Sequence, residues 1–281
     1  AQSPGGYWVK PEPIYYPKYT GTVWQLIFLA QLGADGRAPC VAAACDYVLD
    51  HARSSYGGFS AGASPAGMIH CLAGNLAAAM LDLGRLGDAR LDAALDWLAR
   101  SITGDGIAPA EQKGAPVRYY RSGNSAPGFA CSANNHQPCA WGAVKALLAL
   151  SKVPAPARTP AIRAAITTGI DFLFSRDPAV ADYPMGYATK PSQSWFRFGY
   201  PIGYVTDVLQ TLEVLTALGC GSDARLRPTL DLVLSKRDKQ GRWKLEYTYN
   251  GKMWAAIEEK GKPSKWVTLR ALRVLKGCGV A

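Results

Sequence analysis

The stretch that decides the fold is Leu76–Ile107, LAAAMLDLGRLGDARLDAALDWLARSITGDGI. An apolar segment ends at Gly84, a short turn follows, and a second segment then combines apolar residues at helical spacing with a charged stripe. Gly84 suits the left-handed residue that ends a helix, and Asp88 suits the N-cap of the next one. The stretch therefore predicts two antiparallel helices joined by a tight turn.

The same pattern recurs along the chain. Two further copies lie at Leu26–Phe59 and Leu209–Trp243, a degenerate copy with a proline-rich turn lies at 142–174, and a final single helix is expected at 264–279. We therefore expect about nine helices in hairpins. Strand signals are short and confined to residues 7–16 and 243–249.

The first helix of each pair is the more apolar one, so stacked hairpins would place it inside and its partner outside. This predicts an all-α fold of the α/α-toroid type, a ring of about five helical hairpins that need not be complete, around a central cavity. We expect one domain, residues 1–281, whose residues 1–20 form an extended N-terminal arm.

Composition and charge limit the function classes. The 281 residues are 48% hydrophobic and 19% charged, which fits a globular protein with a large core. No apolar run reaches about 18 residues, so no membrane span is expected. The formal charge of +10 is scattered rather than concentrated on one element, so a nucleic-acid partner is not expected. The positive field suits anionic small molecules. The oligomeric state stays open.

The cysteine content indicates the cellular compartment. Seven cysteines leave at least one unpaired in a monomer, and a chain of this length does not need disulfides for stability. We therefore expect reduced thiols and a cytoplasmic location. The chain begins with Ala rather than Met, so an export signal that has been removed stays compatible with the sequence.

The hairpins that end in SSYGGF, TGDGI and DKQGRW, together with the final SKWVTLRALRVLK, resemble the repeats of the terpenoid cyclase and protein prenyltransferase superfamily. They also resemble single-domain bacterial proteins built from these repeats. The resemblance covers most of the chain. It implies an α/α toroid whose active site lies in the central cavity, at the starts of the inner helices and in the loops before them.

Polar and aromatic residues gather at those starts, at one end of otherwise apolar helices, which suits an apolar pocket with a few polar groups. Asn75 has the alternative role of bonding a loop backbone. The residues predicted to bind substrate are Trp24, Asn75, Trp141, Tyr204, Lys265 and Trp266.

Zinc is one interpretation of the segment CSANNHQPCAWG, residues 131–142. Thiolates and imidazole form tetrahedral zinc sites. A set of four such ligands is available from Cys71, Cys131, Cys139 and His136. His70 is an alternative to His136 as the fourth ligand. The spacing between the two loop cysteines is not that of a zinc finger. The Asp-x-Cys…His ligand pattern of protein prenyltransferases is not recognisable, so those ligands are not carried over.

A metal-free reaction is the second interpretation. The segment GFACSANNHQPCAWGAV, residues 128–144, resembles the paired-cysteine loop of linalool dehydratase-isomerase, where cysteines help to add or remove water. That resemblance implies that Cys131 and Cys139 are the reactive pair, with His70 or Asp207 moving protons. A thiol serves this purpose only if its neighbours make it reactive.

A purely structural role is the third interpretation. Unpaired cysteines are commonly buried and inert, so these thiols would pack the loop against the ring and His136 would cap backbone groups. Asp207 would then pair with Lys265 or with an arginine across the ring rather than act as an acid.

The favoured function is an enzyme that acts on a small lipophilic, isoprenoid-like molecule by lyase, isomerase or transferase chemistry. Neither the Asp-x-Asp-Asp nor the Asp-Asp-x-x-Asp motif occurs, which argues against squalene-type and ionisation-type cyclases. Two alternatives remain. One is a polysaccharide lyase or glycosidase, which would show an open cleft lined by Trp and Arg. The other is a non-catalytic lipid-binding or scaffold protein.

Overall fold

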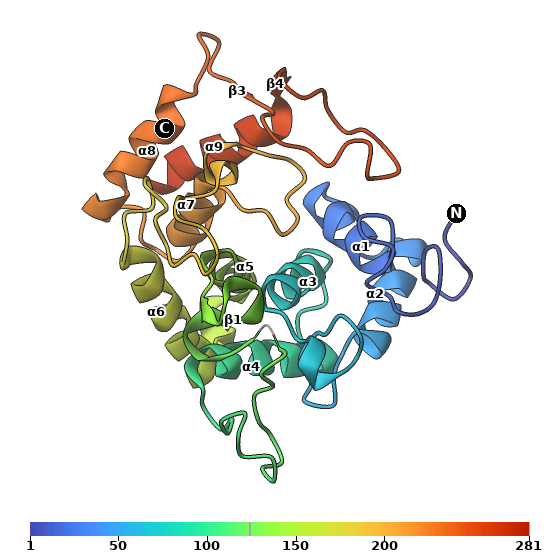
Figure 1. The fold of residues 1–281 in the computed structure, drawn as a ribbon. Coiled ribbons are helices and arrows are strands. Elements are labelled where there is room, and N and C mark those ends of the chain that lie inside the picture. The colour runs from blue at the N-terminus through green and yellow to red at the C-terminus, as the bar shows by residue number, and fades with distance from the viewer. Residues whose placement is uncertain (124, 281) are drawn as a thin grey trace.

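The structure is a computed structural model that describes residues 1–123 and 125–280. Within those ranges the chain forms nine α-helices and four two-residue strands (Figure 1). The helical hairpins expected from the repeats are confirmed. They are α1 (Thr22–Gln31) with α2 (Pro39–His51), α3 (His70–Asp82) with α4 (Ala89–Thr103), α5 (Ala140–Lys152) with α6 (Pro160–Phe174), and α7 (Val208–Ala217) with α8 (Arg227–Ser235), followed by α9 (Lys265–Gly277).

The turns inside the hairpins use the residues that the repeats supply. Gly33, Gly84 and Gly219 follow the first helices with φ angles of 76°, 78° and 89°, the left-handed region in which glycine is not strained. The Asp88 carboxylate caps α4 by accepting a 2.9 Å hydrogen bond from the Arg90 N–H. Asp223 caps in the same way the short 3-10 turn that leads into α8. Local chemistry therefore sets where these helices begin and end.

The helices form an inner and an outer row. The inner row is α1, α3, α5, α7 and α9, each packed against the next, and the pair α3 and α5 has the most extensive contact. Helices α4 and α6 pack together outside α3 and α5 (Figure 1). Helix α3 is buried on most sides, whereas α4 buries one face and exposes the other, as expected for an outer helix. Helix α9, at the end of the inner row, also exposes one face.

The long loops that connect one hairpin to the next lie at one end of the inner row. Each inner helix after α1 follows an outer helix that runs back along the row, so the inner helices start at the same end of the row. The segments that precede them, residues 52–69, 104–139, 175–207 and 236–264, are the long connections, whereas the turns within hairpins are short. This geometry brings residues from distant parts of the sequence to one end of the molecule.

Glycine allows the closest approach in the row. A Cβ atom on Gly74 of α3 would lie 2.2 Å from the backbone oxygen of Lys145 on α5. Only a residue without a side chain fits there, which explains why these two helices pack so tightly.

The glycine–aromatic segments after the outer helices α2 and α8 contribute to the core. Phe59 and Trp243 are both 0% exposed. The indole N–H of Trp243 donates a 2.7 Å hydrogen bond to the Val233 carbonyl of α8, so the ring is fixed as well as buried.

Strands are few, as expected, and β3 lies within the predicted segment 243–249, whereas the segment 7–16 forms no strand. The pairs are β1 (Ala130–Cys131) with β2 (Gln137–Pro138), and β3 (Trp243–Lys244) with β4 (Pro263–Ser264). The strand signal at residues 7–16 was wrong, since the arm makes one isolated bridge, between Gln2 and Trp8. Prolines in the arm remove backbone donors and prevent a ladder. Among the described residues, no helix has both the length and the apolar character that crossing a membrane requires.

Candidate functional site

Three of the predicted cysteines meet where α3 and α5 begin. Cys71 lies in the first turn of α3, Cys139 is the N-cap residue of α5, and Cys131 lies in β1. The Cys139 thiol interacts with the thiols of both Cys131 and Cys71. Gly142 leaves the space for this, because a Cβ there would lie 3.2 Å from the His70 Cβ and 4.0 Å from the Cys71 Sγ. We call Cys71, Cys131 and Cys139 the thiol cluster.

The environment keeps two of these thiols protonated. The neighbouring Cys131 thiol favours ionisation of Cys139, but Cys71 and burial outweigh it and raise the pKa of Cys139 to about 12. The Cys139 thiol and burial raise the pKa of Cys131 well above its ordinary value. Protonated thiols are weak nucleophiles at neutral pH but can donate a proton.

His70 lies beside the cluster as a neutral imidazole. It is 2% exposed, and burial lowers its pKa to about 4. Its Nε2 lies 3.0 Å from the Ser101 Oγ, whose own proton goes to the Leu98 carbonyl at 2.8 Å. Nε2–H is therefore the donor, and Nδ1 carries the lone pair. Nδ1 is buried and has no hydrogen-bond partner among the described residues, so it is a candidate proton acceptor.

The loop between Cys131 and Cys139 is a tight turn held by an asparagine. The Asn134 amide donates to the Pro138 carbonyl at 2.9 Å and to the Pro184 carbonyl at 3.0 Å, and it accepts from the Gly186 N–H at 2.9 Å. His136 is exposed at the tip of the turn, with a φ of 57°. Asn134 therefore fixes the shape of the turn that carries the two cysteines.

Zinc binding at the cluster stays a prediction. The sulfur atoms of Cys71 and Cys131 both interact with Cys139 and are donors that suit a soft metal, but His136 would have to turn inward from its exposed position to join them. Over the part of the chain that the structure describes, no group of three or more His, Cys, Asp or Glu residues has the arrangement that holds a metal ion. We derive no chemical step through a metal.

Aromatic rings from the arm, α1 and the loop before α7 surround Lys18 within electrostatic range of Cys71. The Lys18 ammonium lies 5.3 Å from the ring centroids of Tyr19 and Tyr204 and 5.8 Å from that of Trp24. Cys71 contributes electrostatically to the raised pKa values of Tyr15 and Tyr204. Faces of three rings around a cation show that this corner of the molecule stabilises positive charge.

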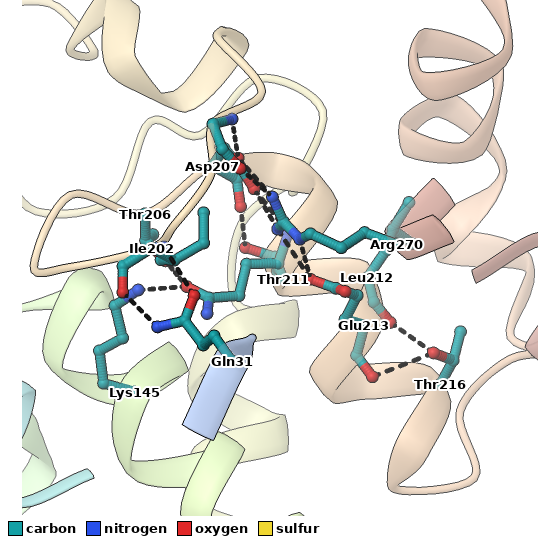
Figure 2. A network of polar contacts seen from close by, with 12 residues as sticks. Gln31, Lys145, Ile202, Thr206, Asp207, Thr211, Leu212, Glu213, Thr216 and Arg270 are labelled. Carbon is teal, nitrogen blue, oxygen red and sulfur yellow. Dashed lines mark hydrogen bonds and ion pairs between the residues drawn. The ribbon is translucent and has the colours of Figure 1, made fainter. Parts of the chain in front are cut away.

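Asp207, predicted as a proton mover, is instead tied into an ion-pair network (Figure 2). Its carboxylate accepts from the Gly199 and Gln210 N–H groups and pairs with Arg270, which also pairs with Glu213. The interpretation of an arginine across the ring thus matches this geometry. To act as an acid, Asp207 would have to leave a buried ion pair.

A buried lysine that the sequence analysis overlooked lies near this network. Lys145 is 0% exposed, and its Nζ donates a hydrogen bond to the Gln210 Oε1, which also accepts from the Thr206 hydroxyl. Figure 2 shows Lys145 and Thr206 pointing toward the same place. Burial lowers the pKa of Lys145 to about 7. Its sequence signal was a lone charge in the apolar segment GAVKALLAL.

A cavity of about 720 Å³ opens between the inner helices, toward the hairpin-turn ends of α1, α3 and α5 and along α7 and α9. Tyr200 and Trp266, two of its lining residues, stack with centroids 4.8 Å apart and planes 4° apart. The cavity is open and mixed in polarity rather than closed and aliphatic. Its polar and charged lining includes Gln31, Asp82, Lys152, Gln210, Glu213, Arg270 and Arg273.

The other predicted substrate-binding residues are dispersed. The Asn75 amide donates a 3.2 Å hydrogen bond to the Gly203 carbonyl and so bonds a loop backbone. Trp141 is half-buried, 6.4 Å from Trp195 between ring centroids, and Lys265 is exposed at the start of α9. The fold thus brings together the thiol cluster, His70, Trp24 and Tyr204, and it places Trp266 at the cavity.

No protein-family model matches this chain, and no curated protein sequence matches it either.

Proposed function

We propose that this chain is an enzyme that acts on a small lipophilic, isoprenoid-like molecule by lyase or isomerase chemistry, on an α/α toroid of the terpenoid cyclase and prenyltransferase type. The reaction centre would be the thiol cluster with His70. The observation that carries the proposal is the contact of Cys139 with Cys71 and Cys131, beside a neutral imidazole and aromatic faces.

These groups suit the loss of water from an allylic alcohol. The Cys139 thiol would protonate the hydroxyl, the C–O bond would break, and water would leave. The faces of Trp24 and Tyr204 would stabilise the allylic cation, as they now do the Lys18 ammonium. His70 Nδ1 would then take a proton from the neighbouring carbon, and its electron pair would form the new double bond.

The inner and outer rows of helices support the toroid, because alternate helices of successive hairpins pack on one another as in a ring. The N-terminal arm covers the thiol end of the row, where Ile14 and Tyr15 are buried. A substrate would therefore enter after movement of the arm.

One observation favours a second candidate, an enzyme or binding protein for an anionic sugar. The cavity is open, and it presents the Tyr200–Trp266 stack together with Arg273, which forms no ion pair among the described residues. Aromatic faces with a cation suit a uronic acid better than a terpene. The two candidates use opposite ends of the inner helices and can be separated by experiment.

The test is conversion of C10 and C15 allylic alcohols by the full chain, with products followed by gas chromatography and mass spectrometry. We expect Cys139→Ser to lower turnover by at least about 100-fold, the size of a general-acid effect. Cys40→Ser is the matched control, because Cys40 is exposed on the outer helix α2. Binding without turnover would favour a lipid-binding protein, and saturable binding of oligouronates that Arg273→Ala abolishes would favour the sugar candidate.

A further inference from the structure

The amine of Lys145 is enclosed between inner helices without a counter-ion. The side chain is 0% exposed, and the α3 backbone closes over the residue at Gly74. Among the described residues no carboxylate lies within ion-pair distance of Nζ, and its hydrogen-bond acceptor is the neutral Gln210 amide. A buried ammonium without an opposite charge costs several kcal/mol, so the fold favours the uncharged amine.

The charged and titratable groups around the amine do not stabilise its protonated form enough to offset burial. These groups are Asp207 and Glu213 on the α7 side, Cys71 on α3 and Arg270 on α9. The two carboxylates are already paired with Arg270. Burial is the largest influence and lowers the pKa of Lys145 to about 7, so a substantial fraction is neutral at physiological pH. A neutral lysine amine is a good nucleophile toward carbonyl carbon.

The amine lies one side chain away from the cavity of about 720 Å³ between the inner helices. Gln210 lines the cavity and accepts the hydrogen bond from Lys145 on its other side. Its Nε2 has no hydrogen-bond partner among the described residues, so rotation of this side chain breaks only the two bonds to Oε1. At about 720 Å³ the cavity lies within the size range of small-molecule sites.

We propose that Lys145 is a nucleophilic amine that forms a Schiff base with a small aldehyde or ketone entering through this cavity. Nζ attacks the carbonyl carbon, and the two amine protons leave with the carbonyl oxygen as water. A C=N double bond replaces the C=O double bond, and no oxidant or reductant is required. Arg273 at the cavity gives preference to a carbonyl compound that carries a carboxylate.

This site differs in its chemistry from the proposed thiol reaction, although Cys71 of the thiol cluster lies within electrostatic range of the amine. Its substrate enters from the hairpin-turn end of the inner helices, and its nucleophile is an amine rather than a thiol. Loss of alcohol conversion in Cys139→Ser therefore says nothing about Lys145, and loss of amine reactivity says nothing about the thiol cluster.

The test is reductive trapping on the full chain at pH 7, with glyoxylate as the probe and sodium cyanoborohydride as the reductant, followed by peptide mass spectrometry. We expect the reduced adduct on Lys145 at least several-fold above that on Lys152. Lys152 is a matched internal control on the same helix, because it lines the same cavity but is ion-paired with Asp82 at 2.8 Å.

Two variants separate the nucleophilicity of the Lys145 amine from the access of the probe to it. Gln210→Glu places a carboxylate beside Nζ and should hold it as an ammonium, so we expect at least tenfold less adduct on Lys145 and an unchanged level on Lys152. Thr206→Val removes the other bond to Gln210 while keeping the shape, and it should retain the adduct. Adducts on exposed lysines with Lys145 unmodified in the folded chain, at pH 7 and again at pH 9, would overturn the proposal.

Discussion

The Arg270 guanidinium on α9 donates two hydrogen bonds to the Asp207 carboxylate at the start of α7, 2.9 Å from Nη2 to Oδ1 and 3.2 Å from Nη1 to Oδ2. The side chains are 7% and 3% exposed. The same carboxylate accepts a 2.7 Å hydrogen bond from the Gln210 N–H and so caps α7. One buried ion pair thus fixes the start of α7 and joins it to the last helix.

Removal of one partner should cost far more than removal of both. Arg270→Met leaves Asp207 buried without its counter-ion, and we expect a loss of about 3–5 kcal/mol in the free energy of unfolding. The double variant Arg270→Met/Asp207→Asn should recover part of that loss. Urea unfolding followed by circular dichroism measures both.

The control is Arg242→Met, which removes a solvent-exposed ion pair with Asp238 and should change stability little. An Arg270→Met variant as stable as this control would show that the buried pair does not hold the two helices together.

Lys145 should make stability depend on pH. Its pKa is about 7 in the folded chain against an ordinary 10.5, so between these values the unfolded chain binds more protons than the folded one. Stability from this group therefore rises as pH rises from 7 toward 10.5, by at most about 1.4 kcal/mol per pH unit. Lys145→Met should remove that rise, seen by urea unfolding at pH 7, 8 and 9.

Lys152→Met serves as the control for this measurement, because the Lys152 side chain is 31% exposed and already paired with Asp82. If wild type and Lys145→Met gain stability in parallel over pH 7 to 9, the amine is charged in the folded chain.

The thiols should differ sharply in reactivity. Cys40 is exposed, whereas burial and neighbours leave Cys139 almost entirely protonated, with a pKa of about 12. Because the thiolate is the reactive form, we expect iodoacetamide at pH 7.5 to alkylate Cys139 at least about 100-fold more slowly than Cys40. Peptide mass spectrometry over time gives both rates, and equal rates would contradict the protonated cluster.

The same measurement tests the zinc prediction. A bound zinc ion would hold the cluster as thiolates and shield them, so treatment with a chelator would accelerate alkylation of Cys71, Cys131 and Cys139 together. Elemental analysis of the purified chain gives the stoichiometry. Alkylation unaffected by the chelator, with no zinc present, would leave the metal-free interpretation.

The helical hairpins could be predicted because their signals are local. Gly84 and Asp88 end one helix and begin the next through contacts within a few residues. The meeting of Cys71 with Cys139 was also predictable, since hairpins of similar length bring the starts of alternate helices to the same end. The strand in the arm failed because a strand signal says nothing about whether a partner lies beside it.

The Lys145 site could not be predicted, because it depends on contacts between distant elements. Lys145 and Gln210 are 65 residues apart, and their meeting depends on the rotation of α5 against α7. In sequence, a single lysine in an apolar helix also fits a side chain that reaches the solvent at the helix surface. The burial of Arg270 could not be predicted either, because other arginines and lysines of α9 are exposed and the sequence does not distinguish them.

The tight contact of α3 with α5 gives the last prediction. Alanine is the better helix former by about 1 kcal/mol, so Gly74→Ala would stabilise a free helix. Here the added Cβ would lie 2.2 Å from the Lys145 oxygen and 2.6 Å from the Ala146 nitrogen, both backbone atoms that cannot move aside. We expect a net loss of at least about 2 kcal/mol in urea unfolding, because overpacking outweighs propensity. Gly62→Ala, whose Cβ would meet nothing within 4 Å, should be nearly neutral. A Gly74→Ala variant as stable as wild type would mean that α3 and α5 lie further apart than described, and the enclosure of Lys145 would fail with it.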